Sequence, residues 1–303
     1  MRLATIEVNQ EETLAVVTEK GVVLVKAIND KQGTSYPVEL LQLLRSGQLD
    51  DLQSWYDAGG KQAIEQGTFA FVDDYKVKPL YRHPSKIWGI GLNYVEHAAD
   101  LSEKAPNTEP ASFMKPDTTI IGIGDTIKIP VQSERTTAEA ELGVIIGKKC
   151  KDVEEEDAEH YVAGYTTIID MTAEDILQKN PRYLTQSKSF DTFFSFGPQF
   201  VTKDEVDDVL SLEVSTIING KLHRKNTVDH MTFTPFNLVS FHSKVMTLLP
   251  GDIISTGTPG AVPIQDGDEV ECRIDGFAPL KNKCIDLKTE THQEGVNHGL
   301  TIT

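Results

Sequence analysis

Three carboxylates stand where neighbouring β-strands would bring them together. Glu139 and Glu141 are two residues apart, directly before an apolar run at 142–146 that is typical of a buried strand. Residues i and i+2 of a strand project from the same face, so both carboxylates should point into one space. A second β-branched segment, 165–169, ends in Asp170. Converging acids raise one another's pKa unless a positive charge lies among them, and a hard divalent cation such as Mg²⁺, which prefers oxygen ligands, would supply it.

Further polar groups could complete a site around such an ion. Lys188 is flanked by aromatic residues and could balance the third carboxylate and stabilise an enolate. His97 and Asp100 stand at i and i+3 of an expected helix, where the carboxylate could orient the imidazole as a base that activates water. Backbone N–H groups of the turn at 255–260 could hold a carboxylate.

Each feature also has an ordinary structural interpretation. The three acids could be solvated groups at strand ends, because Glu-Ala-Glu triplets are common in acidic proteins. The lysine could lie on the surface, as most lysines do. The His–Asp pair could lie on an exposed helix face, and the turn could be a plain connection. The residues alone leave these alternatives open.

The charge balance limits the partners. The chain has 303 residues, with 29 basic and 46 acidic side chains and a formal net charge of −17. Nucleic acids and anionic membranes bind basic surfaces, so we expect neither as a partner. An anionic substrate would have to be attracted by local positive charge, such as a metal ion or a buried lysine.

Cysteine usage and the absence of common cofactor and catalytic motifs limit the compartment and the classes of enzyme that the sequence allows. The three widely spaced cysteines lack a CxxC pair, which favours free thiols in a reducing compartment. The N-terminus alternates like a strand, and no apolar stretch approaches the roughly 20 residues of a membrane span. We therefore expect a cytoplasmic protein. The dinucleotide fingerprint, the Walker A loop, GxSxG, HExxH and zinc-type Cys/His spacings are all absent from the sequence.

The elements that must position these residues fall into two parts. Residues 1–80 predict a small α+β module in which short strands precede helical segments, followed by a proline-containing linker. Residues 81–303 predict a mostly β core with a few helices. Asn219-Gly220 predicts a hairpin turn with positive φ. The expected helices of the core include 154–162 and 236–246.

Several separate blocks, in the right order, resemble the fumarylacetoacetate hydrolase family over roughly residues 86–285. The blocks are Gly91-Leu-Asn-Tyr-Val-Glu-His97, Phe113-Met-Lys-Pro116, Glu139-Ala-Glu-Leu-Gly-Val-Ile-Ile-Gly147, Gly164-Tyr-Thr-Thr-Ile-Ile-Asp170, Lys188-Ser-Phe-Asp191 with Gly197-Pro198, and Gly251-Asp-Ile-Ile-Ser-Thr-Gly-Thr-Pro-Gly260.

The resemblance implies a β-roll or sandwich core, a homodimer, and one Mg²⁺, Mn²⁺ or Ca²⁺ in the core. The acidic partner of the family's general base is commonly Glu, whereas this chain has Asp100. The polar stretch 101–111 would be a lid that closes over the substrate. The roles carried over by resemblance are metal ligand for Glu139, Glu141 and Asp170, active-site lysine for Lys188, general base for His97, and contact of the substrate carboxylate for Thr258.

The implied reaction is hydrolysis of a carbon–carbon bond in a β-diketo acid of the acylpyruvate or fumarylacetoacetate type. It passes through an enolate that the cation and the lysine stabilise. The same site could decarboxylate oxaloacetate or isomerise a dienoate, because each reaction passes through a similar enolate. A catalytically idle member that only binds a metabolite is a further alternative.

One position departs from the family pattern. The family often has arginine four residues after the metal-binding aspartate, whereas Asp170-Met-Thr-Ala-Glu-Asp175 places Glu174 there. If that arginine helps to bind an anionic substrate, its replacement by an acid weakens the grip on a second carboxylate or changes which substrate fits. Lys179 or Arg182 could substitute for it.

Overall fold

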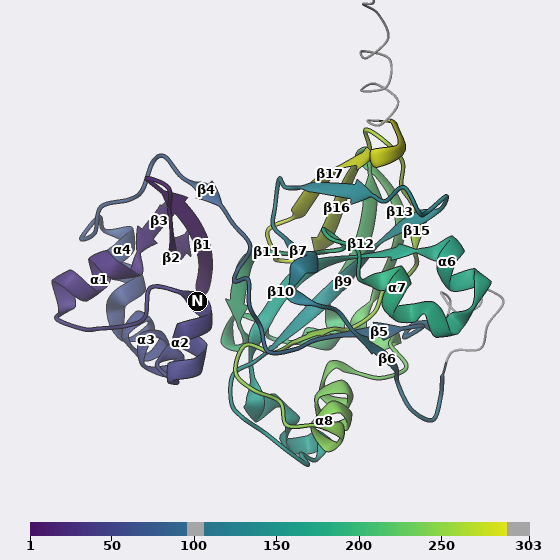
Figure 1. Ribbon diagram of the computed structural model, residues 1–303. Helices are drawn as coiled ribbons and strands as arrows, with labels where there is room; N and C mark the ends of the chain where they lie inside the picture. The colour runs from purple at the N-terminus through teal and green to yellow at the C-terminus, as the bar shows by residue number, and fades with distance from the viewer. Residues whose placement is uncertain (96–105, 290–303) are drawn as a thin grey trace, which may run out of the picture.

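The computed structural model describes residues 1–95 and 106–289, whose strands form two sheets (Figure 1). The strands of the larger sheet are β1 (Arg2–Val8), β2 (Glu11–Thr18), β3 (Gly21–Leu24), β4 (Lys76–Val77), β5 (Ile87–Gly91), β6 (Ala111–Met114), β7 (Ile120–Ile121), β9 (Thr136–Ile146), β10 (Val162–Ala173), β11 (Phe194–Thr202), β14 (Ile253–Ser255) and β15 (Val262–Pro263). The strands of the smaller sheet are β8 (Thr126–Ile129), β12 (Glu213–Ile218), β13 (Lys221–Thr227), β16 (Glu269–Ile274) and β17 (Leu280–Asp286).

Helices are short and connect the strands. No helix within the described ranges is both long and apolar enough to span a membrane. The α-helices are α1 (Val25–Gln32), α2 (Leu40–Ser46), α3 (Leu49–Trp55), α4 (Lys61–Glu65), α6 (Glu174–Lys179), α7 (Leu184–Lys188) and α8 (Pro235–Val245). The other helical segments are the π-helical η1 (Tyr56–Gly60) and the 3₁₀ segments η2 (Asp117–Thr119), η3 (Glu155–Tyr161), η4 (Pro181–Tyr183), η5 (Lys203–Glu205), η6 (Val209–Ser211) and η7 (Val228–His230).

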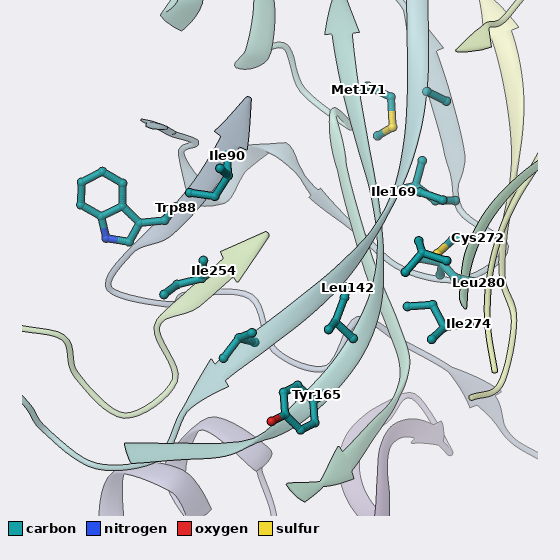
Figure 2. Packing of buried hydrophobic residues seen from close by; sticks show 14 of the residues in the cluster. Trp88, Ile90, Leu142, Tyr165, Ile169, Met171, Ile254, Cys272, Ile274 and Leu280 are labelled. Atoms are coloured by element: carbon teal, nitrogen blue, oxygen red, sulfur yellow. The ribbon is translucent and has the colours of Figure 1, made fainter. Parts of the chain in front are cut away.

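The two long strands β9 and β10 form the centre of the molecule. The larger sheet runs β3-β2-β1-β11-β10-β9-β14-β5-β6, and the smaller sheet runs β13-β12-β16-β17-β8. One face of β9 and β10 packs on β12 and β16, which makes a sandwich. Figure 2 shows Leu142 and Ile169 of the larger sheet facing Cys272 and Ile274 of the smaller one. The predicted mostly β core with a few helices is confirmed.

Alternation along β9 and β10 separates an apolar face from a polar face. In β9, the residues of the core cluster are even-numbered, such as Ala140 and Leu142, and Glu139 and Glu141 lie between them. In β10 the order is reversed, because Ile169 and Met171 enter the core. The antiparallel register places Asp170 opposite Glu139. The strand pleat therefore brings the acids to the face that does not pack on the smaller sheet.

Residues 1–80 form short strands and helices, as the α+β pattern predicted, and their division from the core as a separate domain stays a prediction. The helices α1–α4 lie beside the strands β1–β3 (Figure 1). β1 hydrogen-bonds to β11, with Arg2 opposite Val201, so the module's strands continue the larger sheet. The predicted boundary near residue 80 lies in the segment between β4 and β5.

Two local predictions in the core are confirmed, and one segment differs in detail. The hairpin between β12 and β13 turns at Asn219 and Gly220, which have φ of 51° and 75° as a tight turn of this type requires. The helix expected at 236–246 is α8. The segment expected at 154–162 forms the 3₁₀ helix η3 in place of an α-helix.

Candidate active site

Three carboxylates meet on the polar face of β9 and β10. Glu139, Glu141 and Asp170 each offer an oxygen atom, and these atoms all lie within 4.8 Å of one another. All three side chains are buried, with residue exposures of 8%, 1% and 1%. Carboxylates this close and this dry repel strongly unless cations lie among them. The arrangement therefore has the size and donor chemistry of a site for one divalent ion.

Each glutamate of the triad is oriented by neighbouring donors. Thr172 donates its hydroxyl to Oε1 of Glu139 at 2.7 Å. Ser255 donates its hydroxyl to Oε2 of Glu141, and the backbone N–H of Gly257 donates to the same oxygen at 2.9 Å. The predicted capacity of the turn at 255–260 to hold a carboxylate is thus used within the chain, on Glu141. Both donors hold the same oxygen atom, Oε2, and so fix the direction of the Glu141 carboxylate.

Two buried lysines lie among the three acids. Lys188 donates to Oε2 of Glu139 at 3.2 Å and to Oδ2 of Asp170. Lys115 donates to Oδ1 of Asp170 and to the carbonyl oxygen of Met171. The structure thus buries Lys188 at the acids, at 5% exposure, where the alternative was an ordinary surface lysine.

Lys115 was not predicted as a site residue. It lies in the block Phe113-Met-Lys-Pro116, directly after β6, and its residue exposure is 4%. A lysine at a strand end before proline has the sequence pattern of an exposed residue. Its position in a block shared with a metal-dependent family was the signal that could have identified it.

The charges of this cluster shift one another's pKa. Burial raises the pKa of Glu141 to about 8, and Asp170 and Glu139 add to the rise. Burial lowers the pKa of Lys115 to about 8, although the charge of Asp170 opposes this. Burial would raise the pKa of Asp170, but the two neighbouring lysines outweigh it and hold the pKa below its usual value. Burial would lower the pKa of Lys188, yet the surrounding carboxylates, Asp170 first, raise it.

The cluster as a whole favours an added cation. With all groups ionised, three carboxylates and two ammonium groups carry a total of −1. A divalent ion would change the total to +1. The site could then attract an anionic substrate even though the chain carries a formal charge of −17.

Three further residues were predicted for the site: Thr258, His97 and Asp100. Thr258 is buried in the loop after β14, where its hydroxyl donates to the carbonyl oxygen of Gly260 at 3.3 Å. Its contact with a substrate carboxylate stays a prediction. His97 and Asp100, and residues 101–105 of the lid predicted at 101–111, lie outside the described residues.

Gly257 has a backbone that a larger residue would strain. Its φ is +95°, and a Cβ atom would lie 2.8 Å from Cβ of Asn93 and 3.1 Å from the carbonyl oxygen of Ile90. We expect Gly257→Ala to lower the free energy of unfolding by about 1–3 kcal/mol and to weaken Mn²⁺ binding, because its N–H shifts away from Glu141. Urea unfolding and titration with Mn²⁺ measure the two effects.

Gly267→Ala is the matched control for this prediction. Gly267 also has a positive φ, +82°, but no atom lies within 4 Å of its expected Cβ. It should lose some stability from the backbone alone while Mn²⁺ affinity stays at the wild-type value. Equal effects of both substitutions on Mn²⁺ affinity would contradict a specific role for the Gly257 N–H.

Most of the chain matches a known family. The family described as Fumarylacetoacetate (FAA) hydrolase C-terminal matches residues 86–285. An uncharacterised protein of Methanocaldococcus jannaschii is 44% identical over 211 residues, which are 69% of this chain and 86% of the relative. A Xenopus laevis protein named oxaloacetate tautomerase fahd2, mitochondrial, is 38% identical over 212 residues, with 67% of this chain and 66% of the relative covered.

Solved structures share the fold over almost the whole chain. The crystal structure of maleylpyruvate hydrolase from Sphingobium sp. SYK-6, in complex with manganese(II) ion and pyruvate, is similar with a TM-score of 0.77 at 27% identity. The similarity covers 94% of this chain and 99% of that one. The N-terminal module is therefore included in the shared fold.

Proposed function

The chain belongs to the fumarylacetoacetate hydrolase family, and on that premise we propose that it is a divalent-metal-dependent hydrolase that cleaves a carbon–carbon bond of an acylpyruvate-type β-diketo acid. The observation that carries the proposal is the buried cluster of three carboxylates and two lysines. The manganese ion and pyruvate in the similar maleylpyruvate hydrolase support a divalent ion and a keto acid here.

The ion would be held by Glu139, Glu141 and Asp170, with Mg²⁺ or Mn²⁺ as the expected occupant and Ca²⁺ as an alternative. When bound, it would supply Lewis acidity to the oxygens of a keto acid. Neighbouring donors orient the two glutamate ligands: Thr172 bonds to Glu139, and the N–H of Gly257 bonds to Glu141. Thr258 would contact the carboxylate of the substrate.

The reaction consumes one water and needs a base and an enolate stabiliser. His97, oriented by Asp100, takes a proton from water, and the oxygen attacks the distal carbonyl carbon of the acylpyruvate. The bond between that carbon and the pyruvate methylene breaks, and its electron pair moves to the pyruvate portion as an enolate. The ammonium group of Lys188 stabilises the developing negative charge. Protonation of the enolate gives pyruvate, and the acyl portion leaves as a carboxylic acid.

His97→Ala tests this function. We expect the turnover of acetylpyruvate to fall by about 10²–10⁴-fold, because a positioned base typically contributes that factor. Any decarboxylation of oxaloacetate should persist, since it needs no attacking water. Mn²⁺-induced thermal stabilisation should remain, because His97 is not among the proposed ligands. Acylpyruvate hydrolysis at the wild-type rate would show that His97 does not activate water.

A second candidate is the interconversion of the enol and keto forms of oxaloacetate. The 38%-identical Xenopus laevis relative named as an oxaloacetate tautomerase favours it. Both reactions need a cation and a stabilised enolate, so the cluster serves either. Two assays of the wild-type protein with Mg²⁺ or Mn²⁺ separate these reactions. One measures the hydrolysis of acetylpyruvate, and the other follows the loss of enol-oxaloacetate by its ultraviolet absorbance. A protein that accelerates only the second is a tautomerase.

The proposal also includes a homodimer in the cytoplasm, which the sequence resemblance and composition favour. Light scattering coupled to size exclusion measures the mass in solution against the 33.5 kDa of one chain.

A further inference from the structure

Glu174, which replaces the family's common arginine, is paired with an arginine from another strand end. Glu174 is the first residue of α6 and is 7% exposed. Its Oε2 accepts a hydrogen bond from Nε of Arg135, which directly precedes β9. The side chain of Arg135 is half exposed. Among the described residues the pair uses only Nε, so the two terminal nitrogens of the guanidinium keep their N–H donors for another acceptor.

The backbone around this pair is held by several contacts. The N–H of Glu174 donates to the carbonyl oxygen of Arg135 at 2.8 Å. Ser133 donates its hydroxyl to Oδ1 of Asp175 at 2.8 Å, and the N–H of Glu134 donates to the other oxygen at 3.3 Å. The segment before β9 and the start of α6 are thus held together, so the backbone that carries Arg135 and Glu174 is fixed before any ligand arrives.

Lys179 and Arg182, the substitutes considered from sequence, are less suited to this role. Lys179 is 66% exposed and pairs with Asp175 at 3.9 Å. Arg182 is also exposed. A largely exposed side chain, held at most by a long ion pair, loses more conformational entropy on binding than Arg135, which is half exposed and bonded to a buried acid.

Arg135 lies along the same edge of the polar face as the triad. Thr136 is opposite Ala173 in the β9–β10 ladder, so residues 135 and 174 continue the pair that carries Glu139 and Asp170. Thr137, two residues after Arg135, donates its hydroxyl to Glu139. Arg135 precedes Glu139 by four residues, which is roughly 13 Å along a strand. An arginine side chain and an extended keto acid together can span that separation.

We propose that Arg135 binds the distal carboxylate of a dicarboxylic acylpyruvate, and that Glu174 is the residue that positions it. This rests on the proposed function, because the triad would hold the keto-acid end of the same molecule. Lys115 and Lys188 are already paired with the triad, so a second carboxylate needs another cation. The planar fork of arginine matches a carboxylate through two parallel hydrogen bonds. With Glu174 in place of the family's common arginine, the positive charge for the distal carboxylate would come from Arg135 and not from position 174.

The test compares two substrates that differ at the distal end. Fumarylpyruvate carries a second carboxylate, whereas acetylpyruvate ends in a methyl group. For Arg135→Gln we expect the ratio of kcat/KM for fumarylpyruvate to kcat/KM for acetylpyruvate to fall about 10- to 100-fold, mainly through KM. Arg135→Lys keeps the positive charge but loses the planar fork of donors, so its ratio should lie between those of Arg135→Gln and the wild type. Glu174→Gln should lower the ratio by a smaller factor.

Lys179→Gln and Arg182→Gln are the controls, since each removes one positive charge from a neighbouring helix. Neither should change the ratio, and a fall in either equal to that of Arg135→Gln overturns the proposal. An unchanged ratio in Arg135→Gln also overturns it. Calorimetry with the Mn²⁺-loaded proteins measures the affinities for the same two acids independently of turnover. If the wild type cleaves neither acid, the hydrolase function fails, and the binding preference and its loss in Arg135→Gln still decide the role of Arg135.

Discussion

Glu141→Gln is expected to remove both catalysis and the stabilisation that Mg²⁺ or Mn²⁺ gives the folded protein. The neutral amide is a much weaker ligand than a carboxylate, and even the loss of a residue that only supports a ligand commonly costs 10–100-fold in metal affinity. We expect acylpyruvate turnover to fall by at least about 100-fold at a fixed Mn²⁺ concentration. Steady-state kinetics and melting curves with and without Mn²⁺ measure the two losses.

The same variant should remain folded when the metal is removed with EDTA. Burial raises the pKa of Glu141 from 4.5 to about 8, so ionising this group reduces the stability of the metal-free protein as the pH rises through that interval. Glutamine carries no charge and avoids the loss. At pH 8 the metal-free variant should therefore be at least as stable as the metal-free wild type. A folded variant that still shows the Mn²⁺-dependent shift and full turnover would contradict the proposed ligand set.

Glu271→Gln is the matched control for Glu141→Gln. Glu271 lies on β16 and is 4% exposed, but it pairs with Arg273 and Lys281 and is not part of the triad. The substitution should lower stability by breaking these pairs. It should leave the Mn²⁺-dependent rise in melting temperature and the turnover at wild-type values.

The triad was predictable because its geometry depends mainly on local rules. Alternation along a strand determines that Glu139 and Glu141 share a face, and a β-branched segment that ends in Asp170 predicts where the third acid falls. The register that places Asp170 opposite Glu139 is a non-local property of β9 and β10. It follows from which residues of both strands enter the core, and that depends on the smaller sheet as well.

Partners that come from distant segments were not predictable in the same way. The sequence indicated that the turn at 255–260 could hold a carboxylate, but the choice of Glu141 depends on how β14 pairs with β9. Lys115 approaches Asp170 because β6 ends beside the triad. Arg135 meets Glu174 because the start of β9 lies next to the end of β10. In each case, the partner of a buried charged group comes from a segment that is distant in the sequence, so the local pattern does not identify it.

The N-terminal module shows the same limit on a larger scale. Strands and helices of residues 1–80 follow from local periodicity, and a small α+β unit was predicted from them. The pairing of β1 with β11 joins residues about 200 positions apart. The N-terminal amino group also pairs with Glu205 at 2.8 Å. Such contacts depend on the finished fold of the core and leave no local pattern in the first strand.

Lys188→Met is the second substitution with a large expected effect. Lys188 contacts two members of the triad, and its ammonium group lies 4.7 Å from the centre of the Phe113 ring. We expect kcat for acylpyruvate to fall by about 10²–10³-fold, the loss typical of one preorganised donor to a developing anion. KM should change little, because the charge that Lys188 stabilises grows during the reaction. Steady-state kinetics at saturating Mn²⁺ gives both constants.

Removal of a buried cation can also unfold a protein, so this prediction needs a control for charge and fold. Breaking one buried pair typically costs about 3–5 kcal/mol, because it leaves an uncompensated charge. Saturating Mn²⁺ would compensate the acids in both proteins, and near-ultraviolet circular dichroism checks the fold.

Lys115→Met removes the same charge from the other side of Asp170. Because Lys115 contacts a single member of the triad, its loss should weaken Mn²⁺ binding more than it lowers kcat at saturation. Equal falls in kcat for both variants would mean that the total charge of the cluster, and not the position of Lys188, stabilises the enolate.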